Sequence, residues 1–124
     1  MTGPATPYEG RHLLAELHGC SGLADLGRVE AALTRAAAAA GATLLELKLH
    51  GFGPGQGVTG VALLAESHIS IHTWPEHGYA AVDLFYCGGT VLVHRAVEVL
   101  RERFNPERIK FLVVRRGLQS EVER

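Results

Sequence analysis

The sequence ESHISIHTWPEHGYAAVDLFYCG, residues 66–88, is the segment around which the rest of the chain is organised. Polar and apolar residues alternate along it, and the alternation is interrupted only at Pro75 and Gly78. Such alternation is typical of half-buried strands, and the Pro and Gly indicate a turn. The segment therefore predicts two antiparallel strands, residues 67–73 and 79–87, that form a hairpin.

The register of this hairpin follows from the side chains that must share a face. Opposite residues of an antiparallel pair lie on the same face, so the apolar row that contains Ile71 must meet the row that contains Val82. The same pairing sets Glu66 opposite Cys87, with Cβ atoms roughly 5 Å apart. We therefore expect the thiol beside the peptide bond between Glu66 and Ser67. The other face of the hairpin is expected to carry His68, Ser70, His72, Asp83, Phe85 and Cys87.

The remaining segments predict the layers around the hairpin. Apolar residues recur at helical spacing in two segments, while four others alternate or run as short apolar stretches. The order of strand, helix, three strands, helix and strand predicts an α+β fold, with two helices packed on one face of a mainly antiparallel sheet. The other face is expected to be open to solvent or to pair with a second subunit. The predicted helices cover about residues 25–40 and 90–104, and the further strands cover about 11–17, 43–50, 58–66 and 109–114.

Two of these strands carry specific expectations. Residues 43–50 alternate, which predicts a half-buried strand with Leu45, Leu47 and Leu49 on the inner face. Residues 58–66 are apolar on both faces and lead straight into the hairpin, so we expect this strand to lie inside the sheet.

The composition indicates one soluble domain. A chain of 124 residues that is 47% hydrophobic can bury one modest core. The formal charge of −1 gives no basic field for nucleic acid or an anionic membrane. Residues 1–9 lack the pattern of a signal peptide, and no apolar run approaches the ~20 residues that span a bilayer. We expect a cytoplasmic protein whose two cysteines, Cys20 and Cys87, form no disulfide framework.

An ordered motif across the hairpin resembles that of a known family. Glu-Ser-His-x-x-x-His-Thr-Trp-Pro-Glu at residues 66–76 is followed by Tyr-Ala-Ala-x-Asp at 79–83 and by Cys-Gly at 87–88. This pattern is similar to that of the prokaryotic S-adenosylmethionine decarboxylase proenzymes, and so long a motif is highly specific. The similarity extends from about Gly10 to about Gly117.

The resemblance implies a cofactor that the chain makes from itself. In the family, a serine hydroxyl attacks the preceding carbonyl, the amide becomes an ester, and elimination splits the chain. Here this would divide the single domain between Glu66 and Ser67 into residues 1–66, the β chain, and 67–124, the α chain. Ser67 would become a pyruvoyl group, whose carbonyl forms a Schiff base with the substrate amine and accepts the electrons left by carbon dioxide.

The resemblance also implies roles for further residues. The imidazole of His72 suits proton abstraction during processing, because imidazoles exchange protons near neutral pH. The thiol of Cys87 suits proton donation to the substrate carbanion. Thr59 stands where the family commonly has a serine that assists cleavage, and it keeps the hydroxyl.

Two residues match the substrate-binding positions of the family. Phe52 matches the aromatic residue that stacks on adenine, and Glu76 matches the carboxylate that binds the ribose hydroxyls. The family commonly reads Phe-x-Pro-Gln-Gly in this loop, whereas residues 52–57 read FGPGQG and are one residue longer. The extra glycine therefore affects the expected position of the Phe52 ring.

Each assignment has a simpler alternative. Ser67 could be a surface residue at the start of a strand, and Cys87 a small core residue. His68, His72 and His77 could be exposed residues or metal ligands. We expect no metal, because no separate carboxylate or thiolate cluster completes a site.

Three functions are compatible with these residues. The first is a pyruvoyl-dependent S-adenosylmethionine decarboxylase that supplies the aminopropyl donor for spermidine and other polyamines, which Phe52 and Glu76 favour. The second is a pyruvoyl-dependent decarboxylase of ornithine or arginine, because self-processing does not choose the substrate. The third is a non-catalytic small-molecule-binding domain of similar fold. The joint presence of Ser67, His72 and Cys87 argues against the third.

Strand geometry predicts a shared site. Ser67 and His72 are five residues apart, so they lie on opposite faces and roughly 16 Å apart along a strand at about 3.3 Å per residue. We therefore predict a homodimer in which the open sheet faces meet, in agreement with the shared sites of the family that the chain resembles. One subunit would supply His72, Thr59, Phe52 and Glu76, and the other would supply Ser67 and Cys87.

Overall fold

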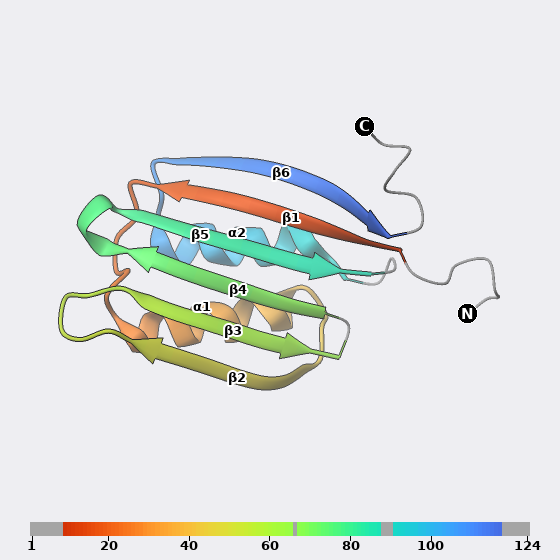
Figure 1. Ribbon diagram of the computed structural model, residues 1–124, viewed down its shortest axis with the longest axis horizontal. Helices are drawn as coiled ribbons and strands as arrows, with labels where there is room; N and C mark the ends of the chain where they lie inside the picture. Colours follow the sequence, from red (N-terminus) through yellow and green to blue (C-terminus); the bar gives the residue numbers. More distant parts are fainter. Residues whose placement is uncertain (1–8, 66, 88–90, 118–124) are drawn as a thin grey trace.

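A six-stranded antiparallel sheet forms one layer of the structure, and two helices form the other (Figure 1). The computed structural model describes residues 9–65, 67–87 and 91–117. This architecture confirms the predicted α+β fold. The elements are β1 (Glu9–His18), α1 (Leu26–Ala39), β2 (Leu44–Gly51), β3 (Val58–Leu64), β4 (Ser67–Trp74), the 3-10 turn η1 (Pro75–His77), β5 (Tyr79–Tyr86), α2 (Val93–Phe104) and β6 (Arg108–Gly117).

The strands are arranged in the order β2-β3-β4-β5-β1-β6. The register of the β4–β5 hairpin is confirmed, because Ile71 pairs with Val82 and Ser67 pairs with Tyr86. The expected pairing of Glu66 with Cys87 lies outside the described residues, since Glu66 is not among them. Four strands separate the two helices, one more than expected, because β3 and β4 are antiparallel neighbours and do not form one continuous strand.

The core lies between the sheet and the helices. Figure 1 shows α1 behind β3 and α2 behind β5. The sheet contributes alternate apolar side chains, and each helix contributes one apolar stripe, as amphipathic helices do. Gly60 lets α1 approach closely, because a Cβ atom there would lie 3.1 Å from Leu33 Cδ1. The largest fully buried side chains are Phe104, Leu17, Leu33, Ile69, Ile71, Leu100 and Val29.

Local signals explain where α1 begins and ends. The Asp25 carboxylate accepts a hydrogen bond from the backbone N–H of Arg28 at 3.1 Å, as an N-cap residue does. Gly41, directly after the C-cap, has φ of +74°, a conformation that glycine adopts at no steric cost. Both ends agree with the prediction for residues 25–40.

Three expectations about burial and strand length were wrong. Leu45 is 65% exposed because the β2–β3 pairing is irregular between Leu44 and Glu46, which interrupts the alternation of β2. β3 does lie inside the sheet, but it is buried on one face only, and Leu63 on the other face is 42% exposed. The last strand continues to Gly117 because it pairs along the whole of β1.

Both helices lie on the same side of the sheet, and the opposite side is called the open face (Figure 1). Side chains that alternate with the buried ones point to this face. It combines polar, aromatic and aliphatic groups, as the prediction for the hairpin requires. The open face carries His12, Leu14, Glu16, Thr59, Val61, Leu63, His68, Ser70, His72, Trp74, Tyr79, Asp83, Phe85, Leu112 and Val114.

Candidate active site

Ser67 is the first residue of β4, and its side chain shares a face with the buried Ile69 and Ile71. Its hydroxyl oxygen is buried, and no hydrogen-bond partner for it lies within the described residues. Leaving a buried hydroxyl unpaired costs on the order of 1–3 kcal/mol, so native proteins keep few such groups. This arrangement is unusual for a residue with a structural role only, and it marks Ser67 as chemically distinct.

A small cavity adjoins Ser67. Its volume is about 10 Å³, which is at the lower limit for holding one water molecule. The surrounding side chains are mostly apolar, so little bulk water would compete there with the Ser67 hydroxyl as the attacking group. The cavity is lined by Ala40, Leu64, Ser67, His68, Ile69, Leu84, Phe85, Tyr86 and Val91.

Cys87 lies at the same end of the sheet as Ser67. It directly follows Tyr86, the strand partner of Ser67, and it is exposed. The sequence predicted the Cys87 thiol beside the start of β4, and the register agrees with this prediction. Cys87 as a core residue is excluded by its exposure.

Thr59 and His72 form a pair on the open face. They are direct partners in the β3–β4 register, and the Thr59 hydroxyl oxygen lies 3.2 Å from Nδ1 of His72. This contact fixes the plane of the imidazole. Ser67 lies on the other face of β4, so the expected separation of Ser67 and His72 onto opposite faces agrees with the structure.

Phe52 and Glu76 lie at the end of the sheet remote from Ser67. Phe52 directly follows β2 and Glu76 lies in η1 directly after β4, and these two strands run in the same direction. The loop with the extra glycine closes on itself, since the N–H of Phe52 donates to the carbonyl of Gly57 at 3.0 Å. Phe52 is 61% exposed, and its ring packs edge-on against His50 at 4.6 Å between centroids. The ring is therefore free to meet a flat ligand.

One chain thus places these residues in three groups. Ser67 and Cys87 lie at one end of the sheet, while Phe52 and Glu76 lie beyond the other end. Thr59 and His72 lie between them on the open face, and Glu66 lies outside the described residues.

The sequence did not predict one hydrogen-bonded cluster on the open face. Asp83 Oδ2 lies 2.5 Å from Nε2 of His12 and 3.4 Å from Nε2 of His68, and Asp83 Oδ1 accepts a hydrogen bond from the Ser70 hydroxyl. His12, His68, Ser70 and Asp83 are called the Asp83 cluster below. His68, Ser70 and Asp83 had been placed on one face, but nothing local in the sequence places His12 beside them.

Two opposing effects set the protonation of Asp83. Burial raises its pKa, but the hydrogen bonds from Ser70, His12 and His68 outweigh burial and hold the pKa below its usual value. Asp83 is therefore a carboxylate at neutral pH. It carries the negative charge around which the cluster is built.

The Asp83 cluster has the residue types of a metal site, because His12, His68 and Asp83 offer three ligand atoms within 4.8 Å of one another. Ligands at about 2.0–2.1 Å from a tetrahedral zinc ion lie roughly 3.3 Å apart. The 2.5 Å between His12 and Asp83 is instead a hydrogen-bond distance. A metal ion would require these two side chains to move apart, so the arrangement is that of a hydrogen-bonded cluster.

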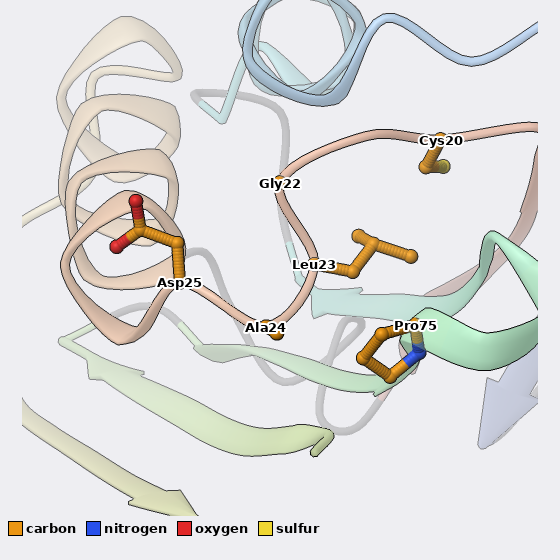
Figure 2. Close-up of a pocket in the computed structure, with 6 residues that line it drawn as sticks. All are labelled: Cys20, Gly22, Leu23, Ala24, Asp25 and Pro75. Carbon is orange, nitrogen blue, oxygen red and sulfur yellow. The ribbon is translucent and has the colours of Figure 1, made fainter. Parts of the chain in front are cut away.

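A separate recess lies beside η1 (Figure 2). Its volume is about 420 Å³, and Pro75 faces Leu23 and Ala24 across it. Burial raises the pKa of the Cys20 thiol to about 11, so Cys20 is a poor nucleophile at neutral pH. The one carboxylate of the recess, Asp25, already caps α1. Neither Cys20 nor Asp25 therefore gives the recess a catalytic group.

The chain resembles known proteins over most of its length. Residues 11–117 match the model of the S-adenosylmethionine decarboxylase family. The chain is 50% identical over 109 residues to the S-adenosylmethionine decarboxylase proenzyme of Thermomicrobium roseum, with 88% of this chain and 94% of that protein covered. It is 49% identical over 111 residues to the proenzyme of the same name from Methanococcus vannielii, with 88% and 90% covered.

A solved structure resembles the fold. The crystal structure of the adenosylmethionine decarboxylase from Aquifex aeolicus VF5 matches with a TM-score of 0.80 and 40% sequence identity, and the match covers 88% of this chain and 91% of that one. Neither helix within the described residues is long and apolar enough to cross a membrane.

Proposed function

The chain belongs to the S-adenosylmethionine decarboxylase family, and we propose that it is a pyruvoyl-dependent lyase that cleaves itself between Glu66 and Ser67. The observation that carries this proposal is the buried Ser67 hydroxyl, which has no hydrogen-bond partner among the described residues. A hydroxyl already stripped of water needs no further desolvation before it attacks the preceding carbonyl. The products would be residues 1–66 and 67–124.

The processing step is an acyl shift followed by elimination. The Ser67 oxygen forms a bond to the Glu66 carbonyl carbon, the bond from that carbon to the Ser67 nitrogen breaks, and the nitrogen takes up a proton. A base then removes the proton on the Ser67 Cα, and the ester oxygen leaves with Glu66 as a carboxylate. Hydrolysis releases the nitrogen as ammonia and leaves the pyruvoyl carbonyl.

His72 is the base that we assign to the elimination. The Thr59 hydroxyl holds one imidazole nitrogen at 3.2 Å, which orients the ring and leaves the other nitrogen to exchange the proton. Because Ser67 lies at the far end of β4, roughly 16 Å from His72 along a strand at about 3.3 Å per residue, we assign this imidazole to the partner chain of a homodimer. The open face, which no helix covers, is the surface that would meet the partner.

The residues present fit a pyruvoyl group at position 67. Such a group supplies an electron sink for decarboxylation when it is formed. Cys87, beside the strand partner of Ser67, is the proton donor that we assign to the reacting carbon. Phe52 would stack on the adenine and Glu76 would accept the ribose hydroxyls of S-adenosylmethionine. The product would serve as the aminopropyl donor in polyamine synthesis, and we place the enzyme in the cytoplasm.

The test of this proposal is the intact mass of the purified protein after incubation. We expect two fragments, residues 1–66 and 67–124, with the second lighter than its encoded sequence by one ammonia molecule. Carbon dioxide release should be faster with S-adenosylmethionine than with ornithine or arginine. A chain that stays whole after prolonged incubation would favour a non-catalytic binding domain, and faster turnover of ornithine or arginine would favour the second class of decarboxylase.

Substrate choice is tested by the variant Glu76→Gln. Loss of a charged acceptor of ribose hydrogen bonds costs about 1.5–3 kcal/mol, so kcat/KM for S-adenosylmethionine should fall about tenfold to a hundredfold. Glu102→Gln, at an exposed position of α2 and away from the open face, is the matched control and should leave kcat/KM unchanged. Equal losses in the two variants would show that Glu76 has no specific role.

A further inference from the structure

The Asp83 cluster links three strands at the end of the sheet where Ser67 lies. Asp83 is on β5, His12 is on β1, and His68 and Ser70 are on β4. His68 directly follows Ser67 and pairs with Phe85, and its ring stacks on that of Phe85 at 5.9 Å between centroids. The Asp83 side chain is only 22% exposed, so its contacts are shielded in part from water.

The hydrogen bonds of the Asp83 cluster have a defined direction. A guanidinium nitrogen of Arg116 lies 3.4 Å from Nδ1 of His12, and a guanidinium can only donate. Nδ1 of His12 is then the acceptor, so Nε2 carries the proton that His12 donates to Asp83. The carboxylate also accepts from His68 and Ser70, so it is the shared acceptor of all three neighbours.

Cleavage between Glu66 and Ser67 would change what holds the start of β4. Residue 67 would lose its covalent link to β3 and become the end of a chain, and chain ends are poorly ordered unless they are tied down. The remaining ties are the backbone pairing with β3 and β5 and the side-chain contacts of His68 and Ser70 with Asp83. His12 belongs to the other cleavage product, so Asp83 also links the two products.

We propose that Asp83 is a positioning residue that holds residues 68–70 after cleavage and thereby keeps the pyruvoyl group at position 67 in place beside Cys87. This inference rests on the proposed function. Its basis is that three side chains donate hydrogen bonds to the Asp83 carboxylate. Two of these donors, His68 and Ser70, lie within three residues of the cleavage site. A reacting carbon displaced by about 1 Å can lose on the order of a hundredfold in rate.

The experiment compares Asp83→Asn with the wild-type protein and with the control Glu102→Gln. We expect Asp83→Asn to fold and to be cleaved completely by intact mass, while kcat falls at least about tenfold and KM for S-adenosylmethionine changes less than about threefold. Amide hydrogen exchange of residues 67–74, a readout independent of activity, should be faster in cleaved Asp83→Asn. Glu102→Gln should match the wild-type protein in all of these measurements.

Two further variants keep the test decisive if Asp83→Asn folds poorly. Ser70→Ala keeps the Asp83 charge and removes one donor, and it should show the same split between kcat and KM with a smaller loss. His68→Gln keeps a donor toward Asp83 and should retain more activity than His68→Leu.

Several outcomes would overturn the inference. Wild-type kcat and wild-type exchange in Asp83→Asn and Ser70→Ala would remove any positioning role. A rise in KM with unchanged kcat would place Asp83 in substrate binding, and a failure of Asp83→Asn to be cleaved would place it in processing. Failure of the proposed function is recognised separately, because the wild-type protein itself would then stay uncleaved.

Discussion

Replacement of Ser67 by alanine is expected to leave the protein as one uncleaved chain with no measurable decarboxylase activity. Alanine has no oxygen to attack the Glu66 carbonyl, so neither the ester nor the pyruvoyl group can form. The measurements are intact mass and release of carbon dioxide from S-adenosylmethionine. This is the largest effect that any single substitution in the chain should produce.

The fold of Ser67→Ala should survive. The hydroxyl that is removed is buried and has no hydrogen-bond partner among the described residues, so its loss gives up no bond and relieves a desolvation cost. The unprocessed variant should therefore be at least as stable to heat as unprocessed wild-type protein. Ser21→Ala, in the exposed loop after β1, is the matched control and should be cleaved normally. Cleavage of Ser67→Ala between residues 66 and 67 would contradict the assignment of the nucleophile.

Coexpression of Ser67→Ala and His72→Ala chains is expected to restore processing that neither variant shows alone. In a mixed dimer one site combines Ser67 of the His72→Ala chain with His72 of the Ser67→Ala chain, and the other site lacks both. The His72→Ala chain should then be cleaved, and each mixed dimer should have about half of the activity of a wild-type dimer, because one of two symmetric sites is complete.

Different affinity tags on the two chains allow the mixed dimer to be isolated before its mass and activity are measured. The expectation depends on the separation of Ser67 and His72, which lie five residues apart along β4. If the isolated mixed dimer stays uncleaved, His72 acts within its own chain, and β4 must deform near Ser67 to bring the two residues together.

The alternation of polar and apolar residues was sufficient to predict the pairing within the central hairpin, but not the pairing of the hairpin with its neighbouring strands. The pairing of Ile71 with Val82 followed from parity, because only one register puts both apolar rows on one face. Alternation says which face a side chain points to and not which strand lies beside it. The position of β1 between β5 and β6 was therefore not predictable.

The same limit applies to the candidate site. The placement of Ser67 and His72 on opposite faces needed only the spacing within β4. The contact between His12 and Asp83 joins residues far apart in sequence through the β1–β5 pairing, which has no local signal. The exposure of Leu45 was missed because a bulge shifts the phase of the alternation without changing the residue types.

The strand order has a consequence for how the mature enzyme can arise. After the proposed cut, β1, β2 and β3 would belong to one fragment and β4, β5 and β6 to the other, yet β1 lies between β5 and β6. The fragments are interleaved and cannot part without breaking the sheet. The uncut chain folds as a single molecule, whereas unfolded fragments would have to find each other in solution, so their reassembly would depend on concentration. The uncut precursor is therefore the form that folds. The cleaved enzyme keeps this structure, but its two fragments, once unfolded, could regain it only by binding to each other.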